Sequence, residues 1–154
     1  MKRCKDNSAA STEIGYVLTF FLGLMFLTTF SIWTFDIQQA TEERWTNEAI
    51  QENLREIAEA VERSDAAMRL DPNASYAEPV ELRLSADVGL GLILLLDDEK
   101  VTMTDASESK EFSQGISAAS SATHSAEVNL AGVELIWVYL HNGTISIGTQ
   151  QPGF

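Results

Sequence analysis

Residues 14–35 read IGYVLTFFLGLMFLTTFSIWTF, an uncharged run that lies between Glu13 and Asp36. A helix rises about 1.5 Å per residue, so this run would extend roughly 33 Å, against a bilayer hydrocarbon core of about 30 Å. Secretory signal peptides have a shorter apolar region, of about 7–15 residues, followed by a small-residue cleavage site. Here Trp33 and Phe35 lead into charged sequence. The run therefore predicts a retained, single membrane span in contact with lipid.

The short segment before the span is basic. It contains Lys2, Arg3 and Lys5, opposed only by Asp6 and Glu13. Short basic flanks stay in the cytoplasm. We therefore expect a single-pass protein of the cell membrane, with its N-terminus cytoplasmic and its C-terminal domain extracellular.

The remainder of the chain is strongly acidic. Of the 23 Asp and Glu only two precede Asp36, and of the ten Lys and Arg only three do, so residues 36–154 have 21 acidic and seven basic side chains, a net charge of −14. Such a charge repels nucleic acid and anionic lipid, so neither is expected as a partner of the domain. Few lysines and many carboxylates are typical of halophilic proteins, and an ordinary acidic exported domain is the alternative.

The segment that follows the span has helical character. Residues 36–70 contain no Gly or Pro, and apolar side chains recur with helical spacing at Ile50, Leu54, Ile57, Val61 and Met68. The pattern predicts one helix over residues 11–70, half membrane-spanning and half amphipathic, which ends before Pro72. The apolar stripe could pack on the chain's own C-terminal domain, on helices of neighbouring subunits, or on both with different sides.

Beyond Pro72 the spacing of apolar residues changes from that of a helix to the alternation typical of strands. Asn142-Gly143 is a strong hairpin signal because both positions of that turn need positive φ. Residues 105–125 are rich in Ser, Ala and Thr, which predicts a loop. Strands are predicted at residues 80–84, 90–96, 101–104, 126–130, 133–140 and 144–147. The fold class is thus α+β, a long N-terminal helix packed on a small, mostly antiparallel β-sheet domain of about four to six strands.

No catalytic constellation is evident in the sequence. His124 and His141 have no metal-ligand spacing, and no phosphate loop or nucleophile elbow occurs. The acidic triplet at residues 97–99 suits a solvated hairpin tip. We therefore expect no enzyme, no cofactor or metal, and no small-molecule substrate.

Two N-glycosylation sequons occur in predicted extracellular turns. They are Asn73-Ala74-Ser75 and Asn142-Gly143-Thr144. We expect that at least one of these two asparagines is modified.

The entry to the span carries the most specific pattern. A basic leader is followed by Ser8-Ala9-Ala10 and then by Ser11-Thr12-Glu13-Ile14-Gly15, which runs straight into the apolar helix. This stretch resembles the N-terminus of type IV pilin-like proteins, and AASTEIGYVLTFFLG is similar to the start of haloarchaeal pilins. The resemblance covers residues 1–35 closely.

The resemblance implies that a prepilin peptidase removes a leader at residues 1–10, within the cleavage region Ser8, Ala9 and Ala10. The archaeal pattern implies Ala10 as the first mature residue, whereas the bacterial rule of a glutamate at the fifth mature position places the cut between Ser8 and Ala9. It also implies that Glu13 pairs with the new N-terminal amine of a neighbouring subunit, since an unpaired carboxylate near lipid is unfavourable.

The resemblance implies a minor or accessory pilin-like subunit of a surface filament. Its partners would be other pilin-like subunits and their assembly platform. Its domains would be the leader, the helix over residues 11–70 and an extracellular β domain over residues 71–154. The alternative is an uncleaved single-pass protein whose acidic ectodomain binds a partner or the cell-surface layer.

Overall fold

A computed structural model describes residues 7–84, 91–105 and 110–154, with helical side chains from Glu13 onward. The basic leader residues 1–6, and Leu90 of the expected second strand, lie outside the described residues. The chain divides into two compact units, Met1–Arg44 and Trp45–Phe154. The C-terminal, amphipathic half of the helix therefore belongs to the same unit as the strands.

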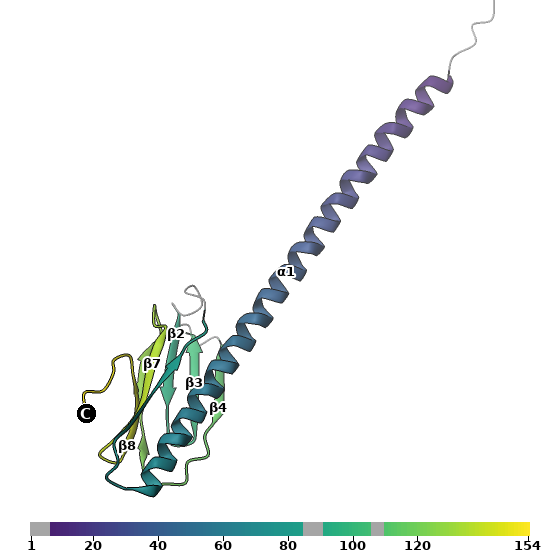
Figure 1. Cartoon of the computed structure of the whole chain (residues 1–154). Coiled ribbons are helices and arrows are strands. Elements are labelled where there is room, and N and C mark those ends of the chain that lie inside the picture. Colours follow the sequence, from purple (N-terminus) through teal and green to yellow (C-terminus); the bar gives the residue numbers. More distant parts are fainter. Residues whose placement is uncertain (1–6, 85–90, 106–109) are drawn as a thin grey trace, which may run out of the picture. The chain divides into compact units, whose positions relative to one another are not determined.

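The predicted helix is confirmed and begins earlier than expected. Helix α1 spans Asn7–Leu70 without interruption (Figure 1). Its 64 residues correspond to about 96 Å at the usual rise. It ends where expected, because Pro72 lacks a backbone donor, and the last turn is closed by a hydrogen bond from the Asp71 N–H to the Ala67 carbonyl, 3.0 Å.

The predicted α+β class is confirmed, although the strands form two four-stranded sheets rather than one small sheet. The first sheet has the order β1-β7-β8-β5 and the second the order β4-β3-β2-β6. All pairings are antiparallel except β5 with β8, which is parallel. The strands are β1 (Tyr76–Glu81), β2 (Leu92–Leu96), β3 (Lys100–Asp105), β4 (Glu111–Gly115), β5 (Thr123–His124), β6 (Ala126–Asn129), β7 (Leu135–His141) and β8 (Thr144–Gly148).

The expected loop at residues 105–125 is partly wrong. Glu111–Gly115 pairs with β3 as the edge strand β4, and Thr123–His124 pairs with β8. Only Phe112 in β4 is half-buried, and its other side chains are exposed, so no alternating apolar pattern marks the strand in the sequence. Residues 106–109, within the same stretch, lie outside the described part of the chain.

The first strand is also shifted from its expected position. It spans Tyr76–Glu81 rather than residues 80–84, and Pro79 is tolerated because β1 is an edge strand. The alternation of apolar and polar residues nevertheless identified buried side chains correctly, since Val80 and Leu82 are both buried. The hairpin at Asn142-Gly143 is confirmed, with φ of 49° and 78° at the two turn residues.

One core joins the C-terminal half of α1 to both sheets. The apolar stripe of the helix is buried as predicted, with Leu54, Ile57 and Val61 at most 1% exposed. From the sheets, the core receives Leu94, Met103, Val101, Ile136, Val138, Leu140 and Ile145, all also nearly inaccessible. Burial of such side chains contributes about 1.5–3 kcal/mol each, so this core is the main source of stability in a domain without cysteine. The stripe is thus covered by the chain's own strands.

Candidate functional site

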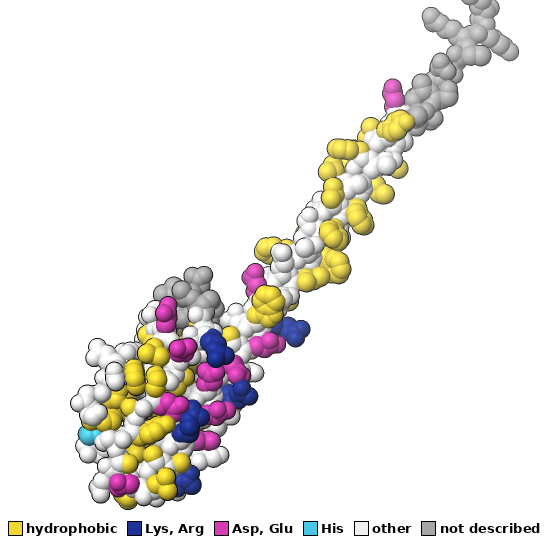
Figure 2. Space-filling model, in the orientation of Figure 1, with side chains coloured by type: hydrophobic (Ala, Val, Ile, Leu, Met, Phe, Trp, Pro, Cys, Tyr) yellow, Lys and Arg dark blue, Asp and Glu magenta, His cyan; other side chains and the backbone are white. Residues whose placement is uncertain are grey.

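The apolar run of α1 is exposed along its whole length. Leu24, its least exposed large apolar side chain, is 45% accessible, and Tyr16 is 75% accessible. Figure 2 shows this segment covered with hydrophobic side chains, while acidic and basic side chains gather on the globular unit. An 18-residue window of the helix has a mean hydropathy of 1.8 and no buried residue. The helix is therefore long and apolar enough to cross a membrane, and the run is no core helix of this chain.

The Ser and Thr hydroxyl groups of the run are satisfied within the helix. Thr19, Thr28, Thr29, Ser31 and Thr34 each donate a hydrogen bond of 2.8–2.9 Å to the carbonyl four residues earlier. Lipid offers no partner for a free hydroxyl donor, so each unpaired group would carry a penalty of several kcal/mol there. This internal pairing makes the five hydroxyls compatible with hydrocarbon. Sequence reasoning missed this feature, although each residue type was visible.

The expected assembly glutamate lies at the start of the exposed apolar surface. Glu13 is an exposed helical residue, and it lines a shallow recess of about 480 Å³ with Ile14, Val17, Leu18 and Phe21. A carboxylate beside an apolar ridge can hold a cation in low-dielectric surroundings, such as an amine on a neighbouring helix. The expected cleavage region, Ser8 to Ala10, lies in the first turns of α1, which starts at Asn7.

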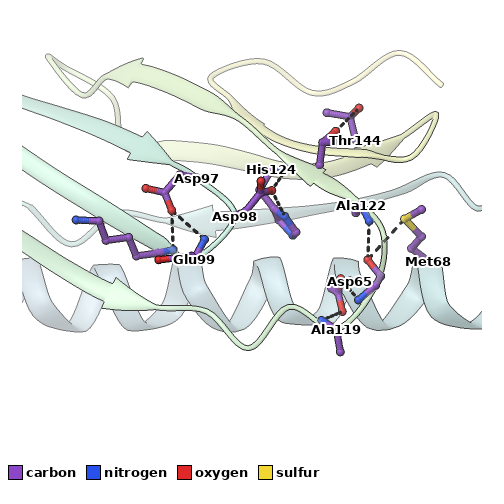
Figure 3. A network of polar contacts seen from close by, with 12 residues as sticks. Asp65, Met68, Asp97, Asp98, Glu99, Ala119, Ala122, His124 and Thr144 are labelled. Carbon is purple, nitrogen blue, oxygen red and sulfur yellow. Dashed lines mark hydrogen bonds and ion pairs between the residues drawn. The ribbon is translucent and has the colours of Figure 1, made fainter.

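Two carboxylates of α1 hold a strap, which we define as residues 116–122, against the helix. The Asp65 side chain is fully buried and accepts hydrogen bonds of 3.1 Å from the backbone N–H groups of Ala119 and Ser120 (Figure 3). One turn earlier, Glu62 accepts the Ser117 N–H at 2.8 Å. Burial opposes ionisation of Asp65, but the hydrogen bonds from Ser120 and Ala119 and the nearby Arg69 outweigh it and lower its pKa.

A third carboxylate joins α1 to β1. Arg63 donates two hydrogen bonds of 2.9 Å to the carboxylate of Glu78, and the Tyr76 hydroxyl donates a third, at 2.8 Å. The hydrogen bonds from Arg63, chiefly, and from Tyr76 lower the pKa of Glu78 although partial burial opposes this. The helix is thus attached to the edge strand of one sheet and, through the strap, to the chain that follows β4.

One member of the acidic triplet at residues 97–99 contacts a strand of the other sheet. Asp98 accepts hydrogen bonds from the His124 backbone N–H, 2.8 Å, and pairs with its Nδ1 at 3.0 Å (Figure 3). These contacts, the backbone bond first, lower the pKa of Asp98. Because Asp98 follows β2 and His124 lies in β5, the pair joins the two sheets. The Asp98 side chain is still 70% exposed, as expected for a solvated tip, and the contact with His124 is an additional role that the sequence did not predict.

The geometry of this pair is suited to holding the chain. The His124 side chain is only 2% exposed, and its Nε2 is buried and without a hydrogen-bond partner among the described residues. In the described ranges, no group of three or more His, Cys, Asp or Glu is arranged to hold a metal ion.

Both sequons lie in exposed turns at the same pole of the globular unit. Asn73 follows the end of α1, and Asn142 occupies the β7–β8 turn. The pairing of Tyr76 with Leu140 brings these turns to one end of the sheet, and a Cβ at Gly143 would lie 3.7 Å from the Met68 side chain. Both asparagines are therefore accessible to a modifying enzyme.

Comparison with protein-family models, with curated proteins and with solved structures finds no match to this chain. A function for this chain must therefore be argued from its own residues.

Proposed function

We propose that the protein is a pilin-like subunit, minor or accessory, of a cell-surface type IV pilus-like filament. Its N-terminal helix would hold it in the membrane before assembly and would then pack against the helices of other subunits. The N-terminus would be cytoplasmic and the globular unit extracellular.

The observation that carries the proposal is a difference in exposure between the two halves of one uninterrupted helix. The half of α1 before Arg44 exposes its apolar side chains, whereas the half after Trp45 buries its apolar stripe in the β domain. The exposed half therefore needs a partner outside the chain, first lipid and then the apolar helices of other subunits. Glu13, at its start, supplies a carboxylate that such packing would leave in need of a positive partner.

The test is a substitution of Glu13 in cells that assemble the filament. Glu13→Ala should lower incorporation into sheared filaments at least about tenfold, because a neighbouring N-terminal amine would lose its ion-pair partner. Glu42→Ala, which removes an exposed carboxylate from the same helix beyond the apolar run, is the matched control and should incorporate normally. Equal incorporation of both variants, at equal membrane levels, would count against the proposal.

One observation favours the alternative, an uncleaved single-pass protein whose ectodomain binds a partner or the surface layer. Ser8 to Ala10 lie within α1, and helical backbone must open locally before a peptidase can cut it. Under this alternative, the apolar helix serves only as an anchor. The mass of the mature N-terminal peptide separates the two functions.

The acidic domain supports the further proposal of a halophilic source. At low salt, a net charge of −14 over residues 36–154 favours expansion through self-repulsion, and dissolved salt screens it. The unfolding temperature should then rise from dilute buffer to molar KCl. A temperature that is unchanged or falls would favour an ordinary acidic exported domain.

A further inference from the structure

The outer face of the sheet β1-β7-β8-β5 carries a row of aromatic side chains. Along β7, Ile136, Val138 and Leu140 point into the core, so the alternating residues point outward. These outward residues are Trp137, Tyr139 and His141, all at least partly exposed. A solvent-facing sheet surface is usually polar, so three rings in succession require an explanation.

The segment after β8 adds a fourth ring to this face. In Figure 1, the chain after β8 turns back beside β7 and β8. The Phe154 ring stacks on His141, with centroids 4.8 Å apart and planes inclined by 15°, and lies 6.3 Å from the Tyr139 ring. Phe154 is still 51% exposed, so these contacts leave ring surface open to a ligand.

Between the rings and the returning chain lies a shallow recess of about 510 Å³. A Cβ at Gly148 would lie 3.4 Å from the Tyr139 ring, so that ring lies directly over the backbone of β8. The recess is lined by Tyr139, His141, Gly148, Thr149, Gln150, Gln151, Pro152 and Phe154. None of these described lining residues is Asp, Glu, Lys or Arg, in a domain where acidic residues are frequent.

We propose that this recess binds a neutral saccharide. A pyranose ring has an apolar C–H face, which packs on aromatic rings, and an edge of hydroxyl groups that both donate and accept hydrogen bonds. Tyr139 and Phe154 offer the aromatic surface, and the amides of Gln150 and Gln151 offer a donor and an acceptor each. Aromatic surface beside a few uncharged polar groups is the usual composition of a small-molecule site.

Charge argues against other ligand classes. The net charge of the surrounding domain repels phosphates and other anions, and the recess has no Lys or Arg to hold them. No carboxylate lines the recess to form an ion pair with a cationic ligand. The inference goes beyond the proposed filament role and does not depend on it, because the recess is built from residues 139–154 alone.

The experiment titrates the full-length chain with neutral oligosaccharides. The protein is held in a zwitterionic detergent without a sugar headgroup, and the probes are linear hexaoses of glucose, mannose, galactose and N-acetylglucosamine. At least one of these hexaoses should bind with a Kd on the order of 1 mM or tighter. Saturation-transfer NMR measures the binding. Because the proposed contacts carry no net charge, the Kd should be the same in dilute and in concentrated NaCl.

Two variants and two controls locate the binding site. Tyr139→Ala and Phe154→Ala should each weaken binding at least about tenfold, whereas Tyr139→Phe, which keeps the ring, should stay within about threefold. Leu135→Ala alters an exposed side chain of the same strand outside the recess and should have no effect. Near-UV circular dichroism checks that each variant is folded.

Three results would overturn the proposal. They are no binding of any hexaose, binding that folded Tyr139→Ala and Phe154→Ala variants retain in full, and selective binding of a proline-rich peptide, the other ligand that aromatic grooves accept. Saccharide binding by an uncleaved, monomeric protein would leave this inference intact while contradicting the filament role.

Discussion

Arg63 in α1 and Glu78 in β1 face each other across the edge of a sheet and share two parallel hydrogen bonds of 2.9 Å. The Glu78 side chain is 26% exposed and that of Arg63 is 48% exposed, so solvent screens the pair in part. The two-point geometry nevertheless gives it more directional strength than a single surface ion pair.

We predict that Glu78→Ala lowers the free energy of unfolding by about 1 kcal/mol, since it removes both bonds and the acceptor of the Tyr76 hydroxyl. Glu52→Ala is the control, because Glu52 pairs with Arg55 within the exposed face of α1 and should contribute only about 0.3 kcal/mol. Urea unfolding of the full-length protein in detergent, followed by tryptophan fluorescence, measures both values. Equal effects of the two substitutions would show that the Arg63 pair has no special role.

The buried carboxylate of Asp65 gives the domain a defined pH dependence. Its folded-state pKa lies below its ordinary value of 3.8, so its stabilising contribution is present above that value and disappears as the pH falls through the folded pKa. The shifts of Glu78 and Asp98 have the same direction. Stability should therefore decline below about pH 4.

Asp65→Asn should lower the free energy of unfolding by about 2 kcal/mol near neutral pH. The free energy of unfolding of this variant should also fall less steeply as the pH is lowered. An amide replaces one acceptor oxygen by a donor, which would face the N–H groups of Ala119 or Ser120. Asp71→Asn, an exposed position near the end of α1, is the control for the loss of a charge. An Asp65→Asn protein with the parent's acid profile would contradict this account of the strap.

A charge placed in the middle of the apolar run should prevent membrane insertion. Met25→Arg adds roughly 2.5–3.5 kcal/mol to the insertion free energy at the bilayer centre. Thr41→Arg, on the same helix beyond the run, should insert normally. The measurement is the share of protein that stays in the membrane after alkaline carbonate extraction. Retention of Met25→Arg at the level of Thr41→Arg would contradict a spanning role for residues 14–35.

At least one of the two sequons should carry a glycan in the native protein. Intact-mass measurement should then exceed the mass of the polypeptide, and Ser75→Ala or Thr144→Ala should remove the excess without changing the acceptor asparagine. A native protein with the bare polypeptide mass, after any leader is removed, would show that exposure of Asn73 and Asn142 is insufficient for modification.

Regular, local patterns made much of this fold predictable. The apolar run and the stripe from Ile50 to Val61 indicated the helix, and Asn142-Gly143 indicated its hairpin, because each signal depends on neighbouring residues alone. The start of α1 at Asn7 and the strand β4 were missed. Residue types that favour N-caps recur from Asp6 to Thr12, so no single helix start stands out in the sequence. An exposed edge strand has no buried face to impose alternation.

The polar contacts were beyond the reach of sequence patterns. Asp98 and His124 are 26 positions apart, and Asp65 and Ser120 are 55 apart, so only the folded topology brings them together. The same holds for the outward rings of β7 and Phe154, which meet because the chain turns back after β8. By contrast, Glu13 and the residues from Ser8 to Ala10 were identified from sequence, and their roles stay predictions.

The central claim, that this helix enters a filament after its leader is removed, is tested most directly at the N-terminus of the native protein. Peptide mapping by mass spectrometry of protein recovered from sheared filaments and from membranes gives the first residue in each fraction. Our account predicts a mature start at Ala9, Ala10 or Ser11 in the filament fraction. A protein that begins at Met1 or Lys2 in the membrane fraction, with none in filaments, would contradict it.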